Sequence, residues 1–422
     1  MCNTMRHIIK WLCLSALLVS CGKEMDTPDT PDVPTGEEMT LHIGFKVPTR
    51  AAEDPRYEDG ATEENYIDIA GGNYRIYFFD EQDKFIARFE PSGFISTEGS
   101  DYCQYSVLGK APDALVKYSD FKMVVLANWP HYPEDLDKES NENLSLKKGE
   151  TTIADICNAD WAQYDCLTDG KANPTAIALN PFAADPSARK LMPFYGVHEY
   201  SDVTFKPGIA TILDEPVTLL RAMAKVEVIL ETDDYFDLSF SSLKINRYNT
   251  KGYCAPKDVF KQSDYDHNGS YNDDYVRTLH LVNDKNDEVE KELVFRHVKQ
   301  WNEGEKLCDK WVAYLPEYQN IGVDDAYSSI KAKFNIQLAS DTPHTIYFAN
   351  YSSGKTDNGN RLNIERNNIY RFHVKCTSYN YSLLLTVSDW EGLYENIFDF
   401  GETQIVSPVS PWDDEKDNEV IF

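Results

Sequence analysis

The sequence has few basic residues for its acidic content. Its 422 residues include 41 Lys and Arg against 70 Asp and Glu, which gives a formal net charge of −29 at pH 7. Nucleic-acid-binding proteins need a positive face to neutralise phosphates, and adsorption to anionic lipid needs a basic patch. We therefore expect no nucleic acid as a partner. The hydrophobic share of 42% and the charged share of 26% are those of a globular chain.

Catalytic motifs are also absent from the sequence. It contains no Gly-x-Ser-x-Gly, no His-Glu-x-x-His and no phosphate-binding glycine-rich loop. Its nine His do not cluster. The sequence therefore predicts a protein that is not an enzyme and uses no cofactor. A glycosidase is the remaining alternative, because its catalytic pair of carboxylates would not stand out among 70 acidic residues.

One segment has the beginning of a calcium-binding loop. Asp264, Asp266 and Asn268 place oxygen ligands at alternate positions, and a glycine follows them. The twelfth position of such a loop should hold a bidentate Glu, but here it holds Tyr275. A solvated loop is therefore favoured over a metal site.

Long amphipathic helices are lacking too, which excludes helical repeats and alternating βαβ units. Aromatic residues make up 13%, and glycine and proline separate short apolar runs. This pattern is typical of an all-β chain built from sandwiches. The strands that we expect lie at residues 39–47, 74–79, 84–89, 121–127, 175–179, 203–206, 217–230, 236–248, 275–281, 292–298, 311–315, 332–338, 345–348, 369–374 and 381–387, with a short helix at 152–158 and an exposed acidic loop at 51–72.

The first 38 residues predict export rather than folding. Basic residues precede the apolar stretch 11–19, which is too short to span a membrane, and Leu-Val-Ser-Cys then ends at Cys21. This is the pattern of a bacterial lipoprotein signal over residues 1–21, with Cys21 as the lipidated residue. A plain secretory signal is the alternative. Residues 22–38 are acidic and proline-rich, which indicates an extended tether.

The first predicted strand shows the clearest alternation in the sequence. Its apolar side chains fall on one face at every second position, so one face should be buried. They are Met39, Leu41, Ile43, Phe45 and Val47. Arg50 and Ala51 follow the strand at the start of the acidic loop. We place a domain boundary near residues 207–216, between an N-terminal domain at 39–210 and a C-terminal domain at 211–390, with a tail at 391–422.

Cysteines and tryptophans each allow two interpretations. Beyond Cys21, six cysteines remain in the exported chain, at positions 103, 157, 166, 254, 308 and 376. Cys157–Cys166 and Cys254–Cys308 are candidate disulfides, and buried thiols are the alternative. Tryptophans such as Trp129 could stack on sugar rings, but core positions are favoured.

The layout resembles the fimbrillin family, the type V pilus subunits of Bacteroidetes. The resemblance lies in the signal ending at Cys21, the tether, the first strand followed by Arg50-Ala51, and five later segments. These segments are Asn73-Tyr-Arg-Ile-Tyr-Phe-Phe-Asp80, Val124-Val-Leu-Ala-Asn128, Leu219-Leu-Arg-Ala-Met-Ala-Lys-Val-Glu-Val228, Trp311-Val-Ala-Tyr-Leu-Pro-Glu317 and Arg366-Asn-Asn-Ile-Tyr-Arg-Phe-His-Val374. The cysteine count and the 32 residues after Trp390 depart from a plain shaft subunit.

The resemblance implies two tandem transthyretin-like β-sandwiches with Greek-key-type strands. It also implies a lipoprotein at the outer membrane and cell surface, cleavage after Arg50 by an arginine-specific protease, and polymerisation with other pilus subunits by strand exchange in support of adhesion. A tip or anchor subunit that keeps its first strand, or a surface glycan-binding lipoprotein, are the alternatives.

The tail is unusually apolar for a terminal segment. We expect part of it to serve as a donor strand for a neighbouring subunit, or else to pack as the last strand of its own domain. The donor candidates are Ile405, Val406, Val420, Ile421 and Phe422.

Overall fold

The computed structural model describes fourteen segments of the chain. They are residues 39–48, 61–98, 102–133, 146–213, 215–233, 239–256, 281–282, 292–304, 306–322, 327–335, 344–349, 361–377, 380–389 and 404–405. Strands dominate these segments, and the α-helices α1 (Ala61–Asn65) and α2 (Ile153–Cys157) have five residues each. The prediction of an all-β chain is confirmed. Among the described residues, no helix combines the length and apolar character needed to cross a membrane.

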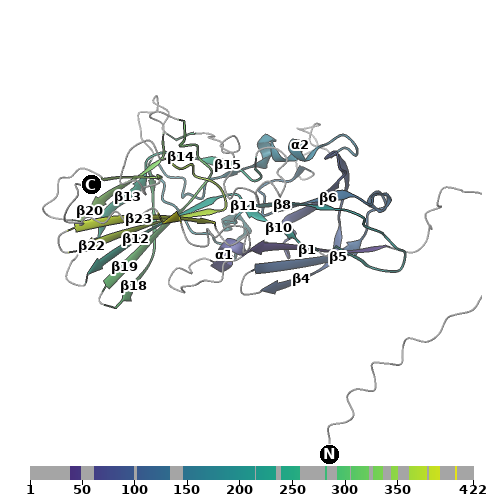
Figure 1. Ribbon diagram of the computed structural model, residues 1–422, viewed down its shortest axis with the longest axis horizontal. Coiled ribbons are helices and arrows are strands. Elements are labelled where there is room, and N and C mark those ends of the chain that lie inside the picture. The colour runs from purple at the N-terminus through teal and green to yellow at the C-terminus, as the bar shows by residue number, and fades with distance from the viewer. Residues whose placement is uncertain are drawn as a thin grey trace, which may run out of the picture. The chain divides into compact units, whose positions relative to one another are not determined.

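Two sheets, built from strands between residues 40 and 221, pack face to face around one core (Figure 1). The first has the order β10-β1-β5-β4, with β9 also beside β1. Its strands are β1 (Thr40–Pro48), β4 (Pro91–Glu98), β5 (Tyr102–Lys110), β9 (Thr211–Ile212) and β10 (Val217–Thr218). The second sheet has the order β11-β8-β6-β2-β3. Its strands are β2 (Tyr74–Phe79), β3 (Phe85–Arg88), β6 (Phe121–Ala127), β8 (Phe194–Tyr200) and β11 (Leu220–Arg221).

Two further sheets, from the second half of the chain, enclose a second core. The larger has the order β18-β19-β12-β22-β23-β24. Its strands are β12 (Ala224–Asp233), β18 (Arg296–Glu303), β19 (Lys306–Leu315), β22 (Asn368–Thr377), β23 (Asn380–Asp389) and β24 (Gln404–Ile405). The smaller has the order β17-β13-β20-β21. Its strands are β13 (Phe240–Ile245), β17 (Leu293–Val294), β20 (Ser329–Phe334) and β21 (His344–Tyr347).

Short strand pairs and turns complete the described fold. The pairs are β7 (Gln163–Asp165) with β15 (Lys251–Tyr253), and β14 (Tyr248–Asn249) with β16 (Leu281–Val282). Single 3₁₀ turns lie at Leu115–Lys117, Asp160–Ala162 and Pro186–Ala188. The β7–β15 pair joins a segment of the first half to a segment of the second.

Several sequence predictions are confirmed because their signals are local. The hairpin at 74–89 forms β2 and β3, and the apolar run at 121–127 forms β6, which is buried along its whole length. The short helix at 152–158 forms as α2, which begins after a capping box between Thr152 and Asp155.

Other predictions are wrong. Residues 175–179 form isolated bridges in place of a strand, and residues 203–206 lie in a loop. The segment predicted to be an exposed loop at 51–72 contains α1, and its described part includes the buried residues Glu64, Ile67 and Ile69. Strands β4, β5 and β8 were not predicted, because their alternation is broken by residues such as Gly109 and Gly196. A Cβ atom at Gly196 would lie 2.5 Å from the Thr218 carbonyl, so close backbone packing requires a glycine there.

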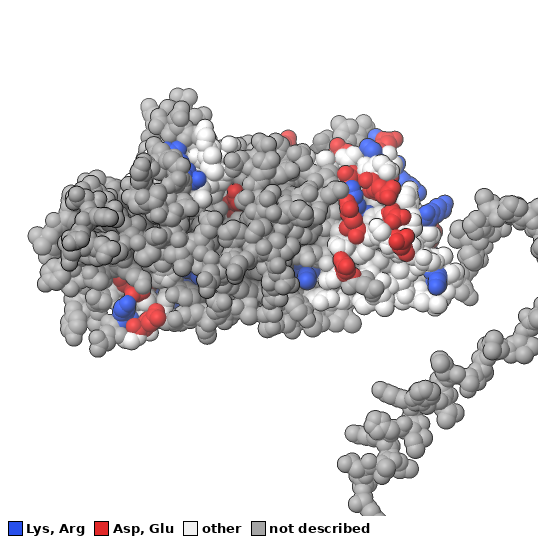
Figure 2. Space-filling model, viewed as in Figure 1, with Lys and Arg blue, Asp and Glu red and all other residues white. Residues whose placement is uncertain are grey.

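Acidic side chains gather on part of the described surface. Figure 2 shows a group of Asp and Glu side chains toward the right of the view, with Lys and Arg mostly at its margin. Like-charge repulsion of this kind favours solubility of the chain and has no bearing on its fold.

Candidate functional site

The first strand, β1, lies inside its sheet rather than at an edge. Each of its nine residues pairs with β5 in antiparallel register, from Thr40 opposite Lys110 to Pro48 opposite Tyr102. Its other edge pairs in parallel with β9 and β10. On that edge, the backbone N–H groups of Leu213 and Leu219 donate to carbonyls of β1 at 3.0 and 2.8 Å. Removing β1 would therefore open two strand edges at once.

The inward face of β1 forms part of the first core. Leu41, Ile43, Phe45 and Val47 are each 0% exposed, as the alternation predicted, and Met39 packs partly buried against the same core. Burying each of these four side chains stabilises the fold by about 1.5–3 kcal/mol before conformational entropy is subtracted. The strand is therefore strongly held in the uncut chain.

Phe45 is the largest of the side chains on this face. Its ring stacks on Tyr105 of β5, with centroids 5.5 Å apart and an interplanar angle of 19°. It also contacts Tyr74 of the opposing sheet at 6.1 Å. Aromatic pairs at these separations add to the stability that burial provides. Phe45 thus links the two sheets of the first sandwich.

The parallel edge of β1 is interrupted in the middle. β9 pairs with Leu41 and His42, and β10 pairs with Phe45 and Lys46, so Gly44 lies opposite the break. A Cβ atom on Gly44 would lie 3.2 Å from the Pro216 side chain, a tight approach that favours glycine. β1 is held continuously by β5 but only in two short stretches on this side.

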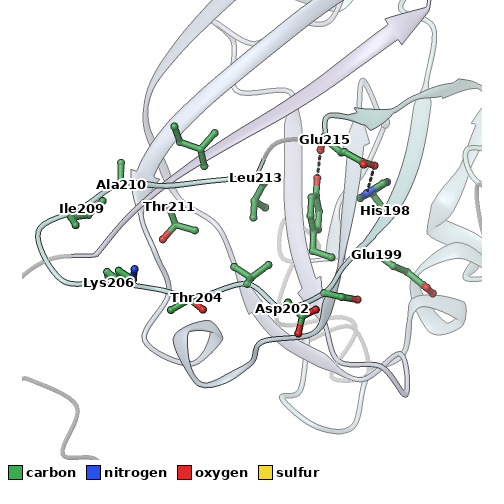
Figure 3. Close-up of a pocket in the computed structure, with 14 residues that line it drawn as sticks. His198, Glu199, Asp202, Thr204, Lys206, Ile209, Ala210, Thr211, Leu213 and Glu215 are labelled. Atoms are coloured by element: carbon green, nitrogen blue, oxygen red, sulfur yellow. Dashed lines mark hydrogen bonds and ion pairs between the residues drawn. The ribbon is translucent and has the colours of Figure 1, made fainter.

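The segment between β9 and β10 is tied to β8. The Tyr200 hydroxyl donates to the Glu215 carbonyl at 2.5 Å, and His198 Nε2 lies 3.2 Å from Glu215 Oε2 (Figure 3). Burial lowers the pKa of His198, although Glu215 and Glu199 act in the opposite direction. These side chains border an open hollow of about 600 Å³ between β8 and the following segment 201–213, which includes β9. The segment thus keeps its own attachments, which do not depend on β1.

The chain after the 49–60 segment is anchored independently of β1. In α1, the Glu64 carboxylate is 2% exposed and lies 2.7 Å from Lys225 Nζ of β12. The Tyr314 hydroxyl donates to the same carboxylate at 2.5 Å, and the Arg221 guanidinium donates to the Asn65 side chain. A break between β1 and α1 would therefore leave α1 in place while removing the covalent link to β1.

The Glu64–Lys225 pair extends into a buried charge network. Glu227 is 0% exposed, and its carboxylate lies 3.0 Å from Lys225, 2.8 Å from Lys310 and 2.6 Å from Arg371. Burial by itself would raise the pKa of Glu227, but the three cations outweigh it and hold that pKa well below the usual value. Each charged group of this network depends on the others for compensation.

Comparisons with known proteins find fimbrial proteins among similar folds. No family model matches the chain, and no curated protein matches it in sequence. A fimbrial assembly protein from Parabacteroides distasonis has 14% identity and a TM-score of 0.40, over 84% of this chain and all of that one. The tip fimbrial protein Mfa3 from Porphyromonas gingivalis, with a C-terminal truncation, has 13% identity and a TM-score of 0.42, over 84% and 100%. At these values the likeness assigns no function to the chain.

Several predicted site residues lie outside the described residues. They are Cys21, Arg50, Ala51, Asp264, Asp266, Asn268, Val406, Val420, Ile421 and Phe422. Ile405 lies in β24, opposite Thr386 of β23, so this piece of the tail pairs with its own sheet. Within the described segments, no group of three or more His, Cys, Asp or Glu could hold a metal ion.

The predicted disulfides are wrong. Cys157, Cys166, Cys254 and Cys308 are buried and form no disulfide. Cys254 belongs to the first core, whereas Cys308 lies on β19 opposite Glu231, and this placement separates the predicted pair. Burial raises the pKa of Cys166 to about 12, so this thiol stays protonated and unreactive at neutral pH.

Proposed function

We propose that this chain is a structural subunit of a cell-surface pilus. It is exported as a lipoprotein attached through Cys21, cut between Arg50 and Ala51 by an arginine-specific protease, and joined to other subunits by strand exchange, in support of adhesion. The observation that carries the proposal is β1, an internal strand with four fully buried side chains that ends two residues before Arg50.

Cleavage would change what holds β1 in the sheet. In the uncut chain, the strand stays paired because it is covalently joined to the sandwich that it completes. After a cut at Arg50, only non-covalent contacts retain it, while α1 stays attached to β12 through Glu64 and Lys225. Cleavage would also separate the lipid at Cys21 from the folded body.

Departure of β1 would leave a specific acceptor. The groove would have β5 on one side and the two short strands β9 and β10 on the other, over an open apolar core. Unpaired strand edges of this kind recruit an added strand. A donor that runs antiparallel to β5 and carries apolar residues at alternate positions would restore the pairing of β1.

The tail remains the proposed donor. Val420, Ile421 and Phe422 end the sequence with three consecutive apolar residues, and Ile405-Val406 precedes them. Ile405 already pairs with β23, so a donor role for that residue would require β24 to leave its own sheet. The structure describes no strand pairing of residues after 406 that a donor role would have to break.

Arg50→Ala tests the proposal, with Arg56→Ala as the matched control in the same segment. The purified chains are treated with trypsin and followed by gel electrophoresis, light scattering and mass spectrometry of the new termini. We expect the control to be cut after Arg50 and to polymerise as the parent does. We expect Arg50→Ala to remain monomeric, or to polymerise only where a cut at Arg56 substitutes. Polymerisation of Arg50→Ala at the parent rate, with no cut between residues 47 and 60, would overturn the proposal.

A further inference from the structure

A second hollow, apart from β1, combines aromatic and basic side chains. Its volume is about 700 Å³, and residues of the 71–75, 128–132, 160–167 and 189–193 segments line it together with Lys251 of β15. A volume of this size is in the range of small-ligand sites. None of these segments includes a strand of the β1 sheet, so the hollow is present whether or not β1 is replaced.

The charge of this hollow is opposite to that of the chain. Arg75, Arg189, Lys190 and Lys251 line it, against the two carboxylates of Asp160 and Asp165. The Arg189 guanidinium is compensated by Asp68 at 2.8 Å. Lys190 and Lys251 are exposed, and within the described residues neither takes part in an ion pair, although Asp165 is the cross-strand neighbour of Lys251. A positive surface in a chain of net charge −29 indicates attraction for an anion.

Aromatic rings line the same hollow. Trp161 is partly exposed and lies beside the buried Trp129, with centroids 6.1 Å apart. The Arg75 guanidinium lies over the Tyr132 ring at 4.3 Å, and it donates to the Gly72 and Tyr74 carbonyls at 2.8 Å. These contacts hold both an aromatic surface and a cation in fixed positions.

The indole N–H groups of Trp161 and Trp129 are both buried, but they differ in their partners. Trp161 Nε1 is buried without a hydrogen-bond partner among the described residues, whereas Trp129 Nε1 donates to the Phe194 carbonyl at 2.7 Å. The hollow thus presents the partly exposed Trp161 side chain and two exposed ammonium groups.

We propose that this hollow binds a carboxylated sugar unit of a glycan. The apolar face of a pyranose ring fits against Trp161, and the sugar carboxylate lies near Lys190 and Lys251. A neutral sugar would use the aromatic surface but leave both ammonium groups without a partner. Sialic acids and uronic acids share the required chemistry, because both join a carboxylate to a pyranose ring.

Binding of defined oligosaccharides to the uncut full chain, measured by calorimetry, tests this inference. The acidic probes are sialyllactose and a hyaluronan tetrasaccharide, and the neutral probes are lactose and a chitin tetrasaccharide. We expect at least one acidic probe to bind at least tenfold more tightly than its neutral counterpart, and to weaken as salt is raised. Whichever acidic probe binds identifies the class of acid. Because the chain is not cut, the result is independent of polymerisation.

Variants at the hollow complete the test. Lys190→Glu/Lys251→Glu changes exposed residues, and Lys117→Glu/Lys148→Glu makes the same change of charge outside the hollow. We expect the first pair to weaken binding of the acidic probe at least tenfold and the control pair to leave it within twofold. Trp161→Ala should weaken it by a similar factor, with circular dichroism as the check of folding. Failure of both acidic probes to bind, equal binding of their neutral counterparts, or equal loss in both lysine pairs would overturn the inference.

Discussion

Phe45→Ala tests how firmly β1 is held before any cut. Phe45 is fully buried and stacks on Tyr105, and the surrounding sheets can only partly close the space that its ring leaves. Large-to-small substitutions of this kind cost about 3–5 kcal/mol. This loss is a large share of the roughly 5–15 kcal/mol by which folded domains are stable. We therefore expect the free energy of unfolding of the uncut chain to fall by about 3–5 kcal/mol.

Urea-induced unfolding, followed by tryptophan fluorescence, measures this loss, since Trp129 is buried in the same core. Lys46→Ala is the matched control, because Lys46 is the next residue of β1 and lies on the outward side, where we expect a change within about 0.5 kcal/mol. Ile43→Val should cost about 0.5–1.5 kcal/mol and stays measurable if Phe45→Ala leaves too little folded protein. In assembled polymers that have lost β1, Phe45→Ala should have no effect. Equal losses from Lys46→Ala and Phe45→Ala would refute the reasoning.

Three further predictions concern other residues. Glu227→Gln should lower the free energy of unfolding by about 3–5 kcal/mol, measured by urea denaturation, because it leaves Lys225 and Lys310 buried with less compensation. Burial lowers the pKa of His198, so the unfolded chain binds this proton at a higher pH than the folded chain does. Stability should therefore fall as the pH drops below about 6.5, and His198→Gln should flatten the change in melting temperature between about pH 7 and pH 5. Cys21→Ala should abolish lipidation and leave the precursor out of the outer-membrane fraction, whereas unchanged fractionation would contradict the proposed anchor.

The sequence predicts β1 well because the signal is contained in the strand itself. Alternation over residues 39–47 marks one buried face, and that face needs no knowledge of its partners. The same holds for β6, where a near-continuous apolar run, interrupted only by Lys122, indicates a strand buried on both sides.

The anchoring of α1 was not predictable in this way. Glu64 lies in an acidic segment whose composition suggests solvent exposure, and one of its partners, Tyr314, is 250 residues away in the sequence. Tertiary contacts at such separations leave no local pattern. The hollow around Trp161 is similar, since it gathers side chains from separate segments. From the sequence, tryptophans could stack on sugar rings or lie in the core. The core was the favoured position, and it is correct for Trp129.

The most direct test of strand replacement is the N-terminal residue of assembled material. Polymers are isolated from cells, and the N-terminal peptide of the subunit is identified by mass spectrometry. We expect the subunit to begin at Ala51, with no peptide from residues 39–48 in the polymer. Assembled subunits that begin at Cys21 and retain β1 would contradict the proposed mechanism.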